Sequence, residues 1–465
     1  MKLARLWPLM FVIASWVLIP CSQVLHADER PRLLVLTDIG GDPDDQQSLI
    51  RLMLYSNEFE IEGLIASAAG TPGELKEAKT RPDLIRQIVN AYGEVRPNLA
   101  KHLDGYPPVD ALRSVIKSGN AERGLKRIGE EHDTEGSRWI IETADRVDPR
   151  PLNITIWGGQ TDLAQALWRV RQDRGDDGLR KFLAQLRVFD IDDQDRLQPW
   201  IFENFPSLFY VLSKSAPKRD KREGAYRGMY LGGDESTTSR EWLNQHVRRD
   251  HGPLGALYPA RTWTDPNPHG ALKEGDTPSW FFFRPIGLND PAHPEWGGLG
   301  GRFRNEKNGL WRDVADKMPT EDGKQQKLDP RASVWRWRTY FQNDFQARLD
   351  WCVKNVDEAN HAPTIQIDGR DTIRPIERTA KAGLPVSITA HASDRDGNHV
   401  SYRWWIYRDA GTFDGEIPLQ NERKDSITIE IPQVAAGKSI HVVLEATDDG
   451  SPPLTSIARV VLNGK

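Results

Sequence analysis

The residues of this chain best suited to chemistry are four aspartates near its beginning: Asp38, Asp42, Asp44 and Asp45. An ordinary turn uses one or two aspartates to bind backbone amides. Four carboxylates within eight residues repel one another unless a cation lies between them. A hard divalent cation such as Ca²⁺, which takes about six to eight oxygen ligands, relieves that repulsion. The alternative is a solvated turn in which Asp44 or Asp45 caps a helix. We interpret the segment as a calcium-type site.

The elements around the aspartates indicate an α/β fold with a mostly parallel sheet. Strands are predicted at residues 32–37, 61–69, 152–157 and 186–191, and helices at residues 46–57 and 161–171. The strands are short apolar runs that end in polar or glycine-rich turns, as buried parallel strands do. Ligands of such a sheet bind beyond the carboxyl ends of its strands, and the aspartates follow the first strand directly.

Composition excludes some classes of function. The chain has 465 residues, of which 38% are hydrophobic and 28% are charged, as in folded proteins of two or three domains. Its formal net charge is −5, and this argues against nucleic acid as a partner because phosphate binding needs clustered lysines and arginines. The histidines lack the spacing of a zinc site.

The first 27 residues have the pattern of a secretory signal peptide. Lys2 and Arg5 precede an apolar run over residues 7–19, which is shorter than the roughly 20 residues that a membrane-spanning helix needs. We therefore predict a periplasmic or secreted protein without a transmembrane segment. Lipid attachment at Cys21 is the less favoured alternative. Cleavage after residue 27 would leave Cys352 as the single thiol, so an intrachain disulfide could not form.

Near residue 360 the sequence pattern changes from helical to alternating. Alternating apolar runs occupy residues 385–391, 400–406, 426–431, 439–446 and 456–462. Turn clusters separate these runs, which is typical of a β-sandwich. We expect a signal peptide at 1–27, an α/β domain at 28–359 and an immunoglobulin-like β-sandwich at 360–465. Asp394 and Asp396 in the sandwich form either a plain turn or a second calcium site.

Several segments resemble those of nucleoside hydrolases. Leu36-Thr37-Asp38 followed by Asp44-Asp45 is similar to the aspartate-rich turn of that family, and residues 154–167 are similar to a later strand–glycine–threonine segment. Weaker similarities lie at residues 59–70, 203–204 and 274–279. The resemblance implies a nucleoside hydrolase-like α/β domain that holds Ca²⁺ and binds a sugar and a water molecule on it.

The same resemblance implies roles for individual residues. The implied metal ligands are Asp38, Asp44, Asp45, the backbone carbonyl of Thr161 or its neighbour, and Asp276. Glu203 and Asn204 would hold the sugar. Either Asp38 or Asp42 would take a proton from the water, and the resemblance leaves open which of the two binds the metal.

The chain as a whole resembles a narrower family, the Sde182-type cellulose-binding proteins. These proteins join a nucleoside hydrolase-like domain to an immunoglobulin-like C-terminal domain. The similarity rests on residues 37–45, 134–137, 274–279 and 295–303.

The sequence departs from true nucleoside hydrolases at two positions. One strand ends in Gly70-Thr71, where theirs ends in Gly-Asn, and Gly275 stands where they often carry a histidine that acts on the leaving base. Glycine cannot donate a proton. Either His269 or His293 protonates the leaving group, or the leaving group is a different one.

Two functions are consistent with these residues. The first is an exported hydrolase-like protein that acts on a glycosidic bond, N-ribosyl bonds included, with a carbohydrate or nucleoside as its ligand. The second is a non-catalytic cellulose- or carbohydrate-binding protein. Trp280 and Trp296 lie near the predicted mouth of the site and could line a glycan groove, because sugars stack on tryptophan faces. Packing in the core is the alternative for both.

Overall fold

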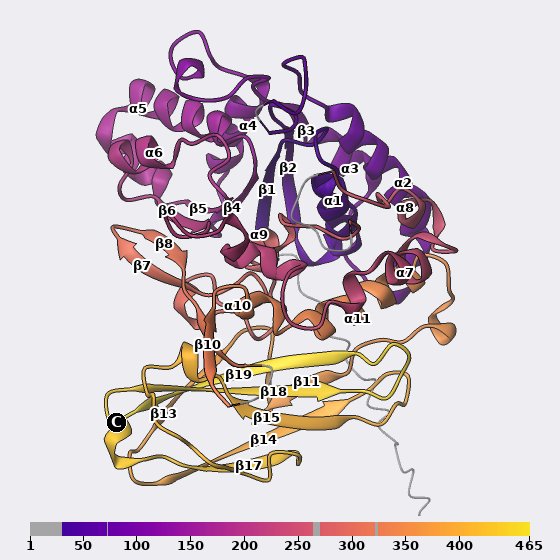
Figure 1. Cartoon of the computed structure of the whole chain (residues 1–465), viewed down its shortest axis with the longest axis vertical. Helices are drawn as coiled ribbons and strands as arrows, with labels where there is room; N and C mark the ends of the chain where they lie inside the picture. The colour runs from indigo at the N-terminus through magenta and orange to yellow at the C-terminus, as the bar shows by residue number, and fades with distance from the viewer. Residues whose placement is uncertain (1–29, 72, 264–269, 321–323) are drawn as a thin grey trace, which may run out of the picture.

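The computed structural model describes residues 30–71, 73–263, 270–320 and 324–465 (Figure 1). The predicted signal peptide, Cys21 and His269 lie outside these residues. The described chain forms an α/β domain and a β-sandwich, which stands below it in Figure 1. Among the described residues, no helix is both long and apolar enough to cross a membrane.

An eight-stranded sheet forms the centre of the α/β domain, in the order β3-β2-β1-β4-β5-β6-β8-β7. Its strands are β1 (Arg32–Thr37), β2 (Glu60–Ala66), β3 (Ile116–Ser118), β4 (Leu152–Trp157), β5 (Leu186–Ile191), β6 (Phe209–Ser213), β7 (Phe303–Lys307) and β8 (Leu310–Asp313). All neighbouring pairs are parallel except β7 with β8. The predicted mostly parallel sheet is therefore confirmed.

Helices cover both faces of this sheet (Figure 1). They are α1 (Asp44–Leu54), α2 (Pro82–His102), α3 (Val109–Ser114), α4 (Glu135–Ala144), α5 (Gln160–Leu183), α6 (Gln198–Asn204), α7 (Arg240–Leu243), α8 (Gly252–Ala256), α9 (Thr277–Phe281), α10 (Ala332–Trp335) and α11 (Arg338–Asp350). Alternate residues of β1 enter two separate cores: Leu33 and Val35 pack with α1 and α2, and Leu34 and Leu36 pack with α4 and α5. Burial on both faces explains why the strand is apolar throughout.

The C-terminal part is a sandwich of a five-stranded and a four-stranded sheet. Its strands are β11 (Thr364–Ile367), β12 (Arg370–Asp371), β13 (Ile376–Ala380), β14 (Pro385–Ser393), β15 (Ser401–Ile406), β16 (Leu419–Gln420), β17 (Ser426–Glu430), β18 (Ser439–Thr447) and β19 (Thr455–Gly464). Each of the five predicted runs is a strand, and the predicted β-sandwich is confirmed. A separate hairpin of β9 (Asp316–Pro319) and β10 (Gln326–Asp329) precedes α10.

The two parts of the chain are joined by buried polar contacts. Arg459 of β19 is fully buried and donates to the carbonyl oxygens of Trp296 (2.7 Å) and Gly297 (2.9 Å). The Tyr407 hydroxyl donates to Asp316 at 2.6 Å. These groups lose their hydration on burial and stay satisfied only while both parts are in place.

A buried ion pair ties the segment before α9 to α1. The Arg51 guanidinium donates to Glu274 at 2.5 and 3.1 Å, and both side chains are fully buried. The Tyr258 hydroxyl also donates to Glu274. This pair fixes the segment from residue 273 onward against the helix that follows the acidic turn.

We expect Glu274→Gln to lower the free energy of unfolding by about 3–5 kcal/mol, because the substitution leaves the buried Arg51 charge uncompensated. Urea unfolding followed by tryptophan fluorescence measures the change. Asp110→Asn, which breaks the exposed pair with Arg113, is the control and should leave the midpoint unchanged. An unaltered midpoint in the Glu274 variant would contradict this account of the segment.

Candidate functional site

The acidic turn lies at the carboxyl edge of the parallel sheet, between β1 and α1. Gly40 has a φ of 117°, a conformation that residues with a side chain rarely adopt. At the end of β4, Gly158 also has a positive φ, and a Cβ atom there would lie 2.7 Å from the side chain of Asp38. Glycine at these two positions lets the turn bend and lets β4 approach it closely.

Three carboxylates converge beside this turn. One oxygen each of Asp44, Asp45 and Asp276 lies within 4.8 Å of the others, as the ligand atoms of a metal ion do. Asp276 comes from the distant segment that begins α9, and it is 3% exposed. Its Oδ2 atom has no hydrogen-bond partner. A buried oxygen of this kind costs free energy unless a cation or a proton joins it.

The other two aspartates of the turn are held by cations. Arg123 donates to Asp38 at 2.7 Å, and Lys273 donates to Asp42 at 2.5 Å and lies 3.1 Å from Asp44. All four predicted aspartates of the turn therefore lie at one site with Asp276. Asp38 and Asp42 are paired with basic side chains, and Asp38 also contacts Asp45 of the three-carboxylate group.

Burial dominates the electrostatics of the site. It raises the pKa of Asp38 to about 6, although Arg123 opposes the shift. Burial, together with the charges of neighbouring aspartates, holds the pKa values of Asp45 and Asp276 well above the ordinary range. Burial disfavours the Lys273 ammonium, but the charges of Asp44 and Asp42 outweigh it and raise the pKa of Lys273. The raised pKa values mean that these carboxyl groups favour a bound proton, or a cation in its place, in addition to Arg123 and Lys273.

Thr161 lies at the first turn of α5, at the same edge of the sheet. Its amide and its hydroxyl both donate to Asp195, at 2.8 and 2.7 Å. Asp195 also accepts from Arg123 at 2.8 Å. The Thr161 side chain therefore supports the loop after β5, and its role as a metal ligand through the carbonyl stays a prediction.

Glu203 and Asn204 are not at this site. Both belong to α6, where Glu203 is exposed and Asn204 accepts from Arg171 at 3.2 Å. Arg171 is ten residues beyond Thr161 along α5, which is about 15 Å of helix. The predicted sugar-binding role of the pair does not fit this position, because α6 carries the chain away from the sheet edge to pack on the core around Ile201.

Trp280 and Trp296 do not line an open groove either. Trp280 is fully buried, with its ring 5.3 Å from that of Tyr55. Trp296 is 8% exposed and stacks on His293 with 4.0 Å between ring centroids. Its ring also contacts that of His441 in the sandwich, with 5.2 Å between ring centroids. Trp280 is a core residue, while Trp296 and His293 belong to the junction between the two parts of the chain.

The remaining aspartate pair forms a turn. Asp394 accepts from the amides of Asp396 (2.8 Å) and Asn398 (3.1 Å), and Asp396 accepts from the His361 ring at 3.0 Å. These contacts form the turn, and the buried Oδ2 of Asp394 has no hydrogen-bond partner, so a second calcium site stays a prediction.

Sequence reasoning missed the basic side chains of the site. Lys273 directly precedes residues 274–279, a segment with a resemblance to nucleoside hydrolases. Asp195 closes the acidic run that begins at Asp190. Arg123 lies in a loop after β3 that carries no pattern of its own, so only the fold reveals it.

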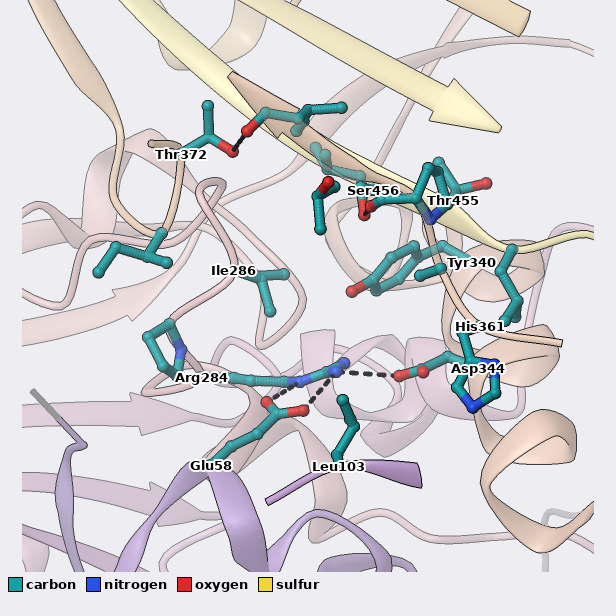
Figure 2. Close-up of a pocket in the computed structure, with 18 of the residues that line it drawn as sticks. Glu58, Leu103, Arg284, Ile286, Tyr340, Asp344, His361, Thr372, Thr455 and Ser456 are labelled. Carbon is teal, nitrogen blue, oxygen red and sulfur yellow. Dashed lines mark hydrogen bonds and ion pairs between the residues drawn. The ribbon is translucent and has the colours of Figure 1, made fainter. Parts of the chain in front are cut away.

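A cavity of about 230 Å³ lies elsewhere, between the α/β domain and the sandwich (Figure 2). Glu58, Arg284 and Asp344 form ion pairs along one side, and Thr455 and Ser456 of the sandwich lie on another (Figure 2). The lining does not include Asp38, Asp42, Asp44, Asp45 or Asp276. The cavity and the acidic site are thus separate features.

Comparison with known proteins supports a common origin for both parts of the chain. Residues 32–303 match the nucleoside hydrolase-like domain of cellulose-binding Sde182, and residues 385–464 match the C-terminal domain of cellulose-binding protein Sde0182. No curated protein matches the chain.

Solved structures give the same result. A nucleoside hydrolase-related hypothetical protein from Saccharophagus degradans, associated with carbohydrate metabolism, is 33% identical over 94% of this chain and 100% of that one, with a TM-score of 0.79. Human CDH23 repeats EC21-23 are 18% identical over 24% of this chain and 35% of that one, with a TM-score of 0.18. The fibronectin(III)-like modules of Clostridium thermocellum CbhA are 18% identical over 22% and 47%, with a TM-score of 0.15. The last two similarities are too low to carry an argument. The first similarity and the two family matches are sufficient, and the chain belongs to the family of cellulose-binding Sde182 proteins with a nucleoside hydrolase-like domain.

Proposed function

We propose that this protein is an exported carbohydrate-binding protein that captures a β-glucan at the acidic edge of its α/β domain with the help of Ca²⁺. The observation that carries the proposal is the buried, unpartnered Oδ2 of Asp276 beside Asp44 and Asp45. The family descriptions name cellulose as the ligand of related proteins, and this favours a glucan over a nucleoside.

The donor set fits calcium. Asp44, Asp45 and Asp276 offer carboxylate oxygens, which hard cations prefer, and zinc sites instead use nitrogen and sulfur. Bound calcium would neutralise the three carboxylates and offer coordination positions to vicinal sugar hydroxyls. Thr37 donates to Asp45 and orients it, and Lys273 pairs with Asp44 at 3.1 Å.

The basic side chains favour binding over hydrolysis. A general base must be free to accept a proton, yet Asp38 is paired with Arg123 and Asp42 with Lys273. A leaving group also needs a proton donor. Gly275 provides none. Of the two histidines predicted for this role, His293 stacks on Trp296 at the domain junction, and His269 lies outside the described residues.

Hydrolysis of a glycosidic bond is the second candidate, and one observation favours it. Burial raises the pKa of Asp38 to about 6, a value that suits a carboxylate which takes a proton from water near neutral pH. In this mechanism Asp38 would leave Arg123 and activate the water, and the negative charge nearby would stabilise an oxocarbenium-like transition state.

Calcium should stabilise the wild-type protein, by about 2.7 kcal/mol at a concentration 100 times its dissociation constant. Asp276→Asn should abolish this gain, yet should be at least as stable as the wild type without metal, because it removes a buried charge that repels its neighbours. Thermal melts with and without Ca²⁺ measure both the calcium response and the stability of the metal-free protein. Asp173→Asn, on the exposed face of α5, should behave as the wild type. A calcium response that persists in the Asp276 variant would contradict the site.

The stability of the metal-free protein should fall as pH rises from about 4 to above 6. The folded-state pKa of Asp38 is raised from 3.8 to about 6, and those of Asp45 and Asp276 are raised as well. Their stabilising contribution is therefore fully present below the unfolded pKa and is lost as pH rises through the folded value. Calcium competes with these protons, so its effect on the melting temperature should be larger at pH 7 than at pH 5. The opposite order would contradict the assignment.

The full chain should be retained on microcrystalline cellulose in Ca²⁺ and released by a chelator. Asp45→Ala should lose the calcium-dependent part of this retention, since it removes one of the three ligands. Reducing-sugar assays on cello-oligosaccharides and nucleosides run in parallel distinguish the two functions. Retention without release of sugar supports binding, whereas calcium-dependent release that Asp45→Ala abolishes supports hydrolysis. If the wild-type protein is not retained on cellulose and releases no sugar, both functions are refuted.

A further inference from the structure

We propose that Trp263 is the stacking platform for a glucose ring of the bound glucan, at the rim of the acidic site. This inference rests on the proposed carbohydrate-binding function and adds the residue that would grip the sugar ring. It replaces the predicted platforms Trp280 and Trp296, which are both buried.

The exposure of Trp263 is unusual for its residue type. It is 62% exposed, and among the exposed large hydrophobic side chains of the described residues it is the one aromatic. Trp157, Trp280 and Trp404 are buried at 2% exposure or less. Within the described part of the chain, no aromatic ring or cation packs on the indole of Trp263. A large apolar face left in water marks a surface suited to binding.

The backbone places Trp263 beside the acidic site. Its amide donates to Asp42 Oδ1 at 2.8 Å. The other oxygen of Asp42 accepts from Lys273, whose ammonium lies 3.1 Å from Asp44. Three polar contacts in series thus connect the backbone amide of Trp263 to the three-carboxylate group.

This combination of groups matches the chemistry of a glucan. The axial C–H groups of a glucose ring are slightly positive and pack on the negative face of an indole. Its equatorial hydroxyls need hydrogen-bond acceptors, and Asp42 and Asp44 provide carboxylate oxygens next to the ring. A flat, uncharged polysaccharide uses both features.

Binding isotherms of the full chain on microcrystalline cellulose and on cellohexaose, in Ca²⁺, test the inference. Trp263→Ala should weaken binding roughly tenfold or more, as the loss of a central aromatic contact does. Trp263→Phe should keep most of the affinity because it keeps an aromatic face. Val434→Ala, at an equally exposed apolar position in the sandwich (72% exposed), is the control and should bind as the wild type.

A second measurement separates stacking from damage to the site. Asp42 contacts the backbone amide of Trp263 and not its indole, so Trp263→Ala should keep the wild-type melting temperature and the same calcium response. Unchanged glucan affinity in Trp263→Ala would overturn the inference and leave the proposed function standing, with the cavity of Figure 2 as the next place to test. Weaker binding with a lost calcium response would also overturn it, because the residue would then be structural. Absence of glucan binding by the wild type would refute the proposed function itself.

Discussion

Mutual repulsion among buried carboxylates is the constraint on which the architecture of this protein depends. Five aspartates meet at one sheet edge, where Arg123 and Lys273 are basic side chains of the described residues that pair with them. The fold does not relieve this repulsion by opening to solvent. It holds the distant segment of Asp276 in place with the fully buried Arg51–Glu274 pair, so the negative potential is concentrated where a divalent cation could use it.

The sequence was most informative where local chemistry and fold agree. Continuous apolar runs predicted β1, β4 and β5, and the density of aspartates predicted the position of the site, since both signals lie within one short segment. Alternating runs likewise predicted the sandwich strands.

Tertiary context decided the residues that sequence reasoning placed wrongly or missed. A tryptophan has the same sequence signature in a core and in a groove, so the burial of Trp280 and the exposure of Trp263 could not be distinguished beforehand. Glu203-Asn204 resembles a sugar-binding pair in its local sequence, yet α6 places both residues away from the acidic site. Arg123 reaches Asp38 from 85 residues away, and no spacing rule predicts such a partner.

The buried Arg459 has a consequence for how this protein can be divided. Its guanidinium donates hydrogen bonds to backbone carbonyls of the α/β domain. Most arginines instead face a carboxylate or water. A sandwich expressed alone would carry this charge and the Tyr407 hydroxyl on a newly exposed apolar surface. The two parts therefore depend on each other physically. A sandwich grafted onto an unrelated protein as an affinity tag would carry a surface whose buried polar groups have lost their partners.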